Sequence, residues 1–539
     1  EIITDGFRNA YDFAFTPAGD VFTYDSDGER DVSLPWYRPT RVFHVVPGSH
    51  AGWVSRSWKR PGGFFDMPPV LSRLGRGSPT GVLCYRHQQF PPEYQGAAFV
   101  LDWTFGRIVA VHPTADGSGF SATDELFMSG AGQHGFAPTD AVVGPDGALY
   151  VSVGGRGTRG GVYRVKYTGT ASTAGGQKSA VEAPRRLSFD STDVNQLLTD
   201  CLEAPQPLAA WSRAKWVPVA RQLGNRILEQ AAVDSGRPVV QRIRALEILL
   251  ELFGGPDVSL LSRLAADNEP QVRARTAWLR GRMRPAVADS RMTSHLLIDS
   301  DPLVVRMTLE SLAGVDRSLP LHELAEPLAV ALDSEDRLVR QTAARVVHRV
   351  SEQARQNILT AAARRSSRAE LACRLGMVLR ASRPQVDAGH LEFGLNLLKS
   401  PSSVQDRRDA IRLLQLALGD VGPGQKLPPV YDGYVSPHSF EAVERQLDEA
   451  RVVTVELYPT GDAETDHELC RLLAMLAPPN RQLLDALLDE TGPDSDPVAD
   501  IHRLLVLSRL PLELTRTQWG QVARVLLRLD SELAARQLP

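Results

Sequence analysis

The chain has 539 residues, with 60 Lys and Arg against 64 Asp and Glu and a formal net charge of −4 at pH 7. This length exceeds one compact core and predicts about three or four units, unless repeats extend the chain by stacking. The weak negative charge gives no general attraction to nucleic acid or to an anionic membrane. No apolar run approaches the roughly 20 residues that cross a bilayer. Composition therefore favours neither a nucleic-acid binder nor a transmembrane protein.

Residues 1–168 have the pattern of short β-strands, because apolar and aromatic stretches alternate with Gly, Pro and Asp turns. The phrase at 12–24 returns at 141–151, and a related unit lies at 97–111. Recurring strand–turn–strand units are typical of β-propellers. We count about three units, whereas a closed ring needs about four to eight blades. We therefore expect the C-terminal part of a propeller whose first blades are missing from this sequence.

The remaining chain has a helical pattern. Residues 169–190 are small and polar and predict a linker. From 191 to 539 apolar residues recur at helical spacing, with a 32-residue period marked by Pro238, Pro270 and Pro302 and fainter copies near Ser367, Pro401 and Pro497. This pattern resembles HEAT-like helical-hairpin repeats and predicts an α-solenoid, with a surface insertion near 419–436.

An arginine follows the start of each repeat, at Arg242, Arg273, Arg306 and Arg340. We expect these side chains to pair with acidic residues of neighbouring repeats, which would tie the helices together. Binding of an acidic partner is the alternative.

Three phrases carry a family resemblance. Residues 6–19 match G-x-R-N-x-x-x-x-A-F-x-P-x-G, and two further phrases follow in order at 78–100 and 140–165. Together they resemble the glucose/sorbosone dehydrogenases, which are quinoprotein propellers. With helical repeats behind them, they are most similar to the secreted "membrane-bound dehydrogenase" proteins of planctomycetes. The resemblance implies half of a six-bladed propeller, oxidation of a sugar or alcohol, and a periplasmic or extracellular location.

The same resemblance implies site residues. Arg8 and Asn9 match the pair that contacts pyrroloquinoline quinone (PQQ), whose carboxylates and carbonyls suit a guanidinium and an amide. Arg156, after two glycines, is a further cofactor-facing candidate. Asp25 and Asp27 lie where the family places Ca²⁺ ligands, although the family's own acidic arrangement is not reproduced. A purely structural interpretation also holds, in which the aspartates cap a turn and Arg8 bridges blades.

Catalytic residues stay unassigned, because the family's general-base histidine lies upstream of the Arg8–Asn9 phrase. The sequence has no C-x-x-C-H haem motif, so a haem-domain electron acceptor is expected outside this chain. Whether the chain alone is an enzyme is open. The alternative function is a non-catalytic scaffold that binds a carbohydrate or a protein partner, the latter on the concave face of the solenoid.

Overall fold

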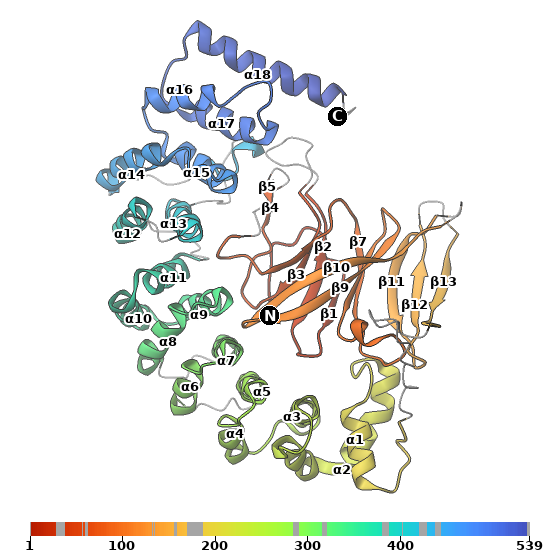
Figure 1. The fold of residues 1–539 in the computed structure, drawn as a ribbon. Coiled ribbons are helices and arrows are strands. Elements are labelled where there is room, and N and C mark those ends of the chain that lie inside the picture. The colour runs from red at the N-terminus through yellow and green to blue at the C-terminus, as the bar shows by residue number, and fades with distance from the viewer. Residues whose placement is uncertain are drawn as a thin grey trace, which may run out of the picture.

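The computed structural model describes residues 2–28, 38–55, 58–59, 63–131, 133, 135–155, 159–169, 187–283, 290–314, 321–379, 387–400, 403–419, 428–436 and 443–535. Strands fill the first part and helices the second, so the chain has a mixed β plus helical-repeat architecture (Figure 1). We call strands β1–β13 the β-module and helices α1–α18 the helical array. Most of the predicted linker, 170–186, lies outside the described residues.

The β-module contains three antiparallel meanders and one small hairpin. The first sheet has the order β1-β2-β3-β6, with β1 Phe13–Phe15, β2 Val21–Asp25, β3 Arg41–Val45 and β6 Val70–Arg73. The second contains β7 Pro79–Cys84, β8 Ala98–Asp102, β9 Arg107–Asp116 and β10 Gly119–Ser129. The third contains β11 Pro138–Val143, β12 Leu149–Val153 and β13 Gly161–Val165. The hairpin pairs β4 Trp53–Ser55 with β5 Trp58–Lys59.

The repeated sequence phrase folds into the same turn twice. In the turn 16–20, Thr16 N donates to Asp20 O at 2.8 Å and Gly19 N donates to Thr16 O at 2.9 Å. The turn 144–148 repeats both bonds at 2.9 Å. Gly19 and Gly147 occupy the same position with φ of 83° and 77°, a conformation that favours glycine. The internal similarity in the sequence is therefore a structural repeat.

The second sheet is buried on both faces. Along β7, Val82 and Cys84 belong to the apolar cluster shared with the first sheet, whereas Leu83 and Tyr85 belong to the cluster shared with the third. Side chains of a strand alternate between its two faces, so consecutive residues of β7 pack against different sheets. The three sheets thus form one stack.

The helices of the array form an inner and an outer row (Figure 1). The inner row is α3 Val239–Phe253, α5 Pro270–Arg280, α7 Pro302–Gly314, α9 Arg337–Arg349, α11 Ser367–Val378, α13 Val404–Ala417, α15 Ala463–Leu476 and α17 Pro497–Arg509. The outer row is α4 Val258–Leu264, α6 Ser290–Leu297, α8 Ala325–Leu332, α10 Glu352–Arg365, α12 Ala388–Lys399, α14 Glu444–Leu457 and α16 Arg481–Asp489. The ends are α1 Val194–Leu202, α2 Ala210–Val233 and α18 Arg516–Ala535.

The predicted repeat starts are confirmed where the structure describes them. Pro270, Pro302 and Pro497 are the first residues of their helices, and Pro238 caps α3. A first-turn proline lacks only an N–H that the helix leaves unpaired. The predicted surface insertion near 419–436 is only partly a surface feature, because Tyr434 is fully buried and bonds His502. No helix of the described residues combines the length and hydropathy needed to span a membrane.

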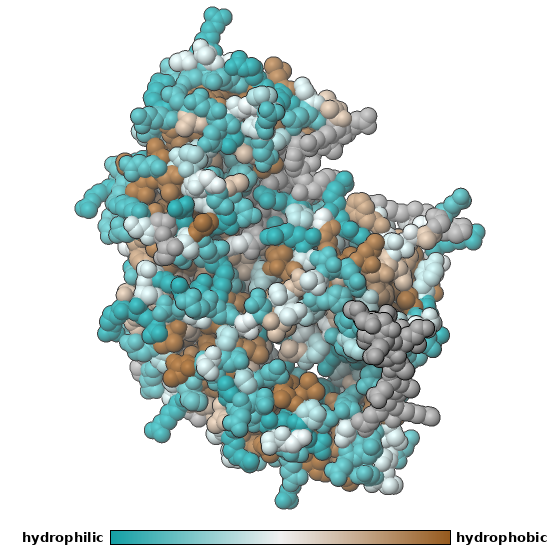
Figure 2. Space-filling view, in the orientation of Figure 1, coloured by the Kyte–Doolittle hydropathy of each residue, from teal (hydrophilic) through white to brown (hydrophobic). Residues whose placement is uncertain are grey.

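The helical array curls around the β-module, which occupies its concave side (Figures 1 and 2). Polar contacts from four inner helices hold this docking: Arg275 with Ala18 O, Arg306 with Asp20, Asp336 with Ser118, and Arg412 with Asp66. The concave face, expected to receive an external partner, is thus covered in large part by the chain's own strands.

The periodic arginines divide between two roles. Arg242 and Arg273 pair with Asp267 and Asp299, which lie in the loops that lead into the next repeats. Arg306 instead reaches Asp20 in the β-module at 2.7 Å, because the turn after β1 packs directly against α7. Arg340 donates to backbone carbonyls of the loop before its own helix. The ladder prediction is therefore right for the first two arginines and wrong for the last two.

Candidate functional site

Four of the predicted site residues lie together, two before β1 and two at the end of β2. The Arg8 guanidinium donates from Nη1 to Asp27 O at 3.0 Å and to Ser26 Oγ at 3.3 Å. Asp25 Oδ1 accepts the backbone N–H groups of Arg8 and Asn9 at 3.1 and 2.9 Å. The Asn9 side chain is exposed. The family resemblance predicts a common site for these residues, and in the structure their atoms are in hydrogen-bond contact.

The carboxylates of this cluster receive hydrogen-bond donors. Asp25 accepts the hydrogen bonds from Arg8 and Asn9 described above, and it is fully buried. Asp27 accepts Arg8 Nη1 at 3.4 Å and the Gly77 amide at 3.3 Å. Within the described ranges, no group of three or more His, Cys, Asp or Glu side chains has the arrangement to hold a metal ion. Ca²⁺ also takes backbone and water oxygens, and residues 29–37 of this loop lie outside the described residues, so the calcium site stays a prediction.

The strand directions show which end of the sheets holds this cluster, and which other segments lie at that end. β1 begins after Arg8 and β2 ends at Asp25, while β12 ends just before Gly154. Because β11 and β12 are antiparallel, Gly154 lies at the end where β11 begins. Trp103 Nε1 donates to Gly154 O at 2.8 Å at this same end. Arg156 itself lies outside the described residues.

Two histidines of the β-module have structural contacts that explain their positions. His44 is buried in the interface, where its Nε2 bonds Asp20 at 3.0 Å. His50 packs over Gly6, whose φ is 72° and where an added Cβ would lie 2.3 Å from the imidazole. Its Nδ1 accepts the Gly52 amide at 3.0 Å. His50 lies near Arg8 because an isolated β-bridge pairs it with Asp5. No local sequence pattern predicts this bridge.

Asp20, His44 and Arg306 form a buried charged cluster between the β-module and α7. Arg306 Nη2 donates to Asp20 Oδ1 at 2.7 Å, and Nη1 reaches Glu310 at 3.2 Å. Burial by itself raises the pKa of Asp20, but the Arg306 charge and the His44 hydrogen bond bring it well below its usual range. Asp20 is therefore a permanently ionised anchor for Arg306.

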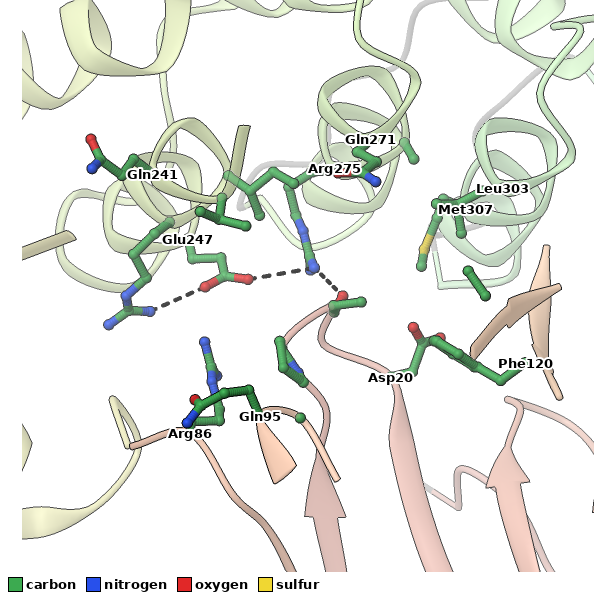
Figure 3. A pocket seen from close by; sticks show the side chains of 18 of the residues that line it. Asp20, Arg86, Gln95, Phe120, Gln241, Glu247, Gln271, Arg275, Leu303 and Met307 are labelled. Carbon is green, nitrogen blue, oxygen red and sulfur yellow. Dashed lines mark hydrogen bonds and ion pairs between the residues drawn. The ribbon is translucent and has the colours of Figure 1, made fainter. Parts of the chain in front are cut away.

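A cavity of about 610 Å³ lies beside this cluster, between the turns of the β-module and helices α3, α5 and α7 (Figure 3). Its charged lining includes Arg86, Arg244, Glu247 and Arg275. Glu247 contacts Arg244 at 3.2 Å and Arg275 at 3.4 Å. Sequence analysis did not identify this site, because its residues come from segments more than 150 positions apart.

Comparisons with known proteins give weak similarities. No protein-family model and no curated protein matches the chain. Among solved structures, a putative oxidoreductase (glucose dehydrogenase) from Thermus thermophilus is similar with 22% identity over 30% of this chain, at a TM-score of 0.24. This chain covers 47% of that protein. A microtubule polymerase with TOG domain arrays is similar with 12% identity over 63% of this chain and 88% of that one, at a TM-score of 0.19. With such TM-scores, neither similarity assigns a function.

Proposed function

We propose that this chain is part of a secreted, quinoprotein-like dehydrogenase that oxidises a sugar or an alcohol. In this proposal the three sheets are consecutive propeller blades and the helical array is a fixed scaffold around them. One observation carries it: Arg8, Asn9, Asp25 and Asp27, which match the family's cofactor region, gather at one end of the first strands.

The arrangement of the sheets supports the assignment as blades. Each sheet is a meander, and the first strand of each contacts the first strand of the next: β1 packs on β7, and β7 on β11. Val82 N donates to Asp12 Oδ2 at 2.9 Å across the first junction, and Thr80 Oγ1 donates to Pro138 O at 2.8 Å across the second. In a propeller the first strands surround the central axis, where cofactor groups from several blades converge.

Arg8 and Asn9 are the residues that would hold the quinone. Arg8 has a half-buried guanidinium and Asn9 an exposed amide, which fit a carboxylate-bearing aromatic ligand. When bound, such a quinone supplies the two-electron acceptor that alcohol oxidation requires. The bond from Arg8 to Asp27 fixes the guanidinium in place, and Asp25 orients the backbone of both residues. A haem protein outside this chain would then take the electrons.

Quinone binding by the full-length native protein tests this function. The Asn9→Ala variant keeps the backbone bond to Asp25 and removes only the side-chain amide, so folding is expected to be unchanged. We expect PQQ, followed by its absorbance or by calorimetry, to bind the native protein and to bind this variant about tenfold more weakly. Arg73→Ala changes an exposed arginine of the same sheet and serves as the control. If the native protein does not bind PQQ, or if Asn9→Ala binds as tightly as the control, the proposal is refuted.

A non-catalytic binding scaffold is the second candidate. The hydrogen bonds that Asp25 and Asp27 accept favour it, because they also suit a purely structural role. Because the β-module covers the concave face, a protein partner would have to dock elsewhere. Turnover of sugars or alcohols by the native protein with PQQ and an artificial electron acceptor distinguishes the two candidates.

A further inference from the structure

We propose that the cavity between the β-module and the helical array is a binding site for a small organic acid, with its carboxylate among Arg86, Arg244 and Arg275. The cavity lies at the turn that follows β1, at the opposite end of this strand from Arg8. The inference is therefore independent of the quinone. A volume of about 610 Å³ falls within the range of about 300–1,000 Å³ that is usual for small-molecule sites.

Positive charge exceeds negative charge on the polar side of this cavity. Three guanidinium groups line it, and Glu247 alone forms ion pairs with two of them. Of the other lining carboxylates, Asp20 is paired with Arg306, whereas Glu203 accepts the neutral Gln241 amide at 2.8 Å and keeps its charge, so three guanidinium groups face two carboxylates. An anion placed here would balance the surplus of positive charge.

Arg244 has hydrogen-bond donors without acceptors. Its side chain is only 7% exposed, yet Nε and Nη2 have no hydrogen-bond partner within the described part of the chain. Its guanidinium stacks over Trp216 at 4.5 Å, which fixes its plane but leaves the donor edge unsatisfied. Buried donors are nearly always paired in native proteins. Both nitrogens are buried away from solvent, so Arg244 contributes its positive charge to the site.

Arg86 is a second cation of the lining, and it is partly exposed. It lines the cavity, and among the described residues it forms neither a hydrogen bond nor an ion pair through its side chain. Burial lowers the pKa of Arg86, and the nearby charges of Arg244 and Arg275 lower it further against the opposing effect of Glu247. A bound carboxylate would reverse this repulsion, because it would contact all three cations.

The remaining lining determines the class of acid. Figure 3 shows Arg86, Gln95 and Glu247 toward one side of the cavity and Phe120, Leu303 and Met307 toward the other. A ligand that spans both sides needs an anionic head and an apolar body. We therefore assign the site to an amphipathic carboxylate and not to a polyhydroxylated sugar acid.

Calorimetry with the full chain tests the assignment, with octanoate as the probe. 1-Octanol keeps the apolar chain without the charge, and gluconate keeps the charge without the apolar chain. We expect octanoate to bind and both analogues to bind at least about tenfold more weakly. Arg86→Met removes a guanidinium that has no protein partner, so it should weaken octanoate binding about ten- to hundredfold with little effect on folding.

Glu247→Gln provides a test with the opposite sign. It removes the negative charge nearest the proposed carboxylate, so octanoate should bind about threefold tighter or more. A merely structural role for Glu247 predicts no gain. The exposed helix residue Arg226, changed to Met, is the matched control and should bind as the native chain does. Lack of octanoate binding, equal binding of either analogue, or unchanged affinity in Arg86→Met would overturn the proposal.

Discussion

Removal of the Arg306 guanidinium is expected to detach the β-module from the helical array. The side chains of Arg306 and Asp20 are only 1% and 4% exposed, so Arg306→Met leaves a buried carboxylate whose remaining hydrogen bond comes from His44. Breaking a buried pair from one side costs about 3–5 kcal/mol. The opening equilibrium of the interface should therefore rise by about a hundredfold or more.

Hydrogen exchange read by mass spectrometry measures this opening. We expect faster exchange in peptides from the turn 16–20 and from α7. Arg242→Met is the matched control, because Arg242 is equally buried but pairs with Asp267 inside the helical array, so it should loosen the array and leave the turn 16–20 protected. The double variant Asp20→Asn with Arg306→Met should recover part of the protection, since the Asp20 charge is gone and only Glu310 stays without its Arg306 partner. A change below about fivefold in Arg306→Met, or no recovery in the double variant, would refute the reasoning.

Three further predictions concern stability. Asp336→Ala removes the N-cap of α9 and both bonds from Ser118, and should cost about 3 kcal/mol in urea unfolding. Burial and nearby arginines lower the pKa of His467 to about 4, so the unfolded state binds more protons, and the His467 contribution to the unfolding free energy should fall by at most about 3 kcal/mol from pH 6.5 to 4. His467→Gln should reduce this dependence, to which His502 also contributes. Gly19→Ala should be more destabilising than Gly254→Ala in thermal unfolding, because both have φ near 82° but only Gly19 packs against another side chain.

Local patterns in the sequence predict much of the architecture. The glycine in each repeated turn, at Gly19 and Gly147, is required by its positive φ, and a positional requirement of this kind is visible in a single sequence. Helix starts at Pro270 and Pro302 are also predictable from one position, because proline suits the first turn of a helix. Arg242 and Arg273 find their partners in the loop just before the next repeat, at nearly the same spacing each time, so their pairing follows from the period.

Contacts between the two parts of the chain are not predictable in this way. Arg306 and Asp20 are 286 positions apart, and Ser118 and Asp336 are 218 apart. Nothing local distinguishes Arg306 from Arg273 in the sequence, yet one faces the β-module and the other faces the next repeat. The curvature of the array decides which arginine meets which partner, and it results from many small packing angles between helices.

The interface contains arginines that are paired with aspartates of the β-module and arginines that are not. The first kind fixes the docking of the two parts, and the second kind belongs to the proposed ligand site. A buried ion pair adds little net stability over an apolar contact, but a misplaced one is costly. Arg306 and Arg412, each paired with an aspartate of the β-module, therefore fix one docking position. Arg244 lies in the same interface with two unpaired buried nitrogens, and burial there lowers the pKa of Arg86, so both oppose docking unless an anion joins them. A ligand carboxylate would then tighten the interface, and octanoate should slow hydrogen exchange in the turn 16–20.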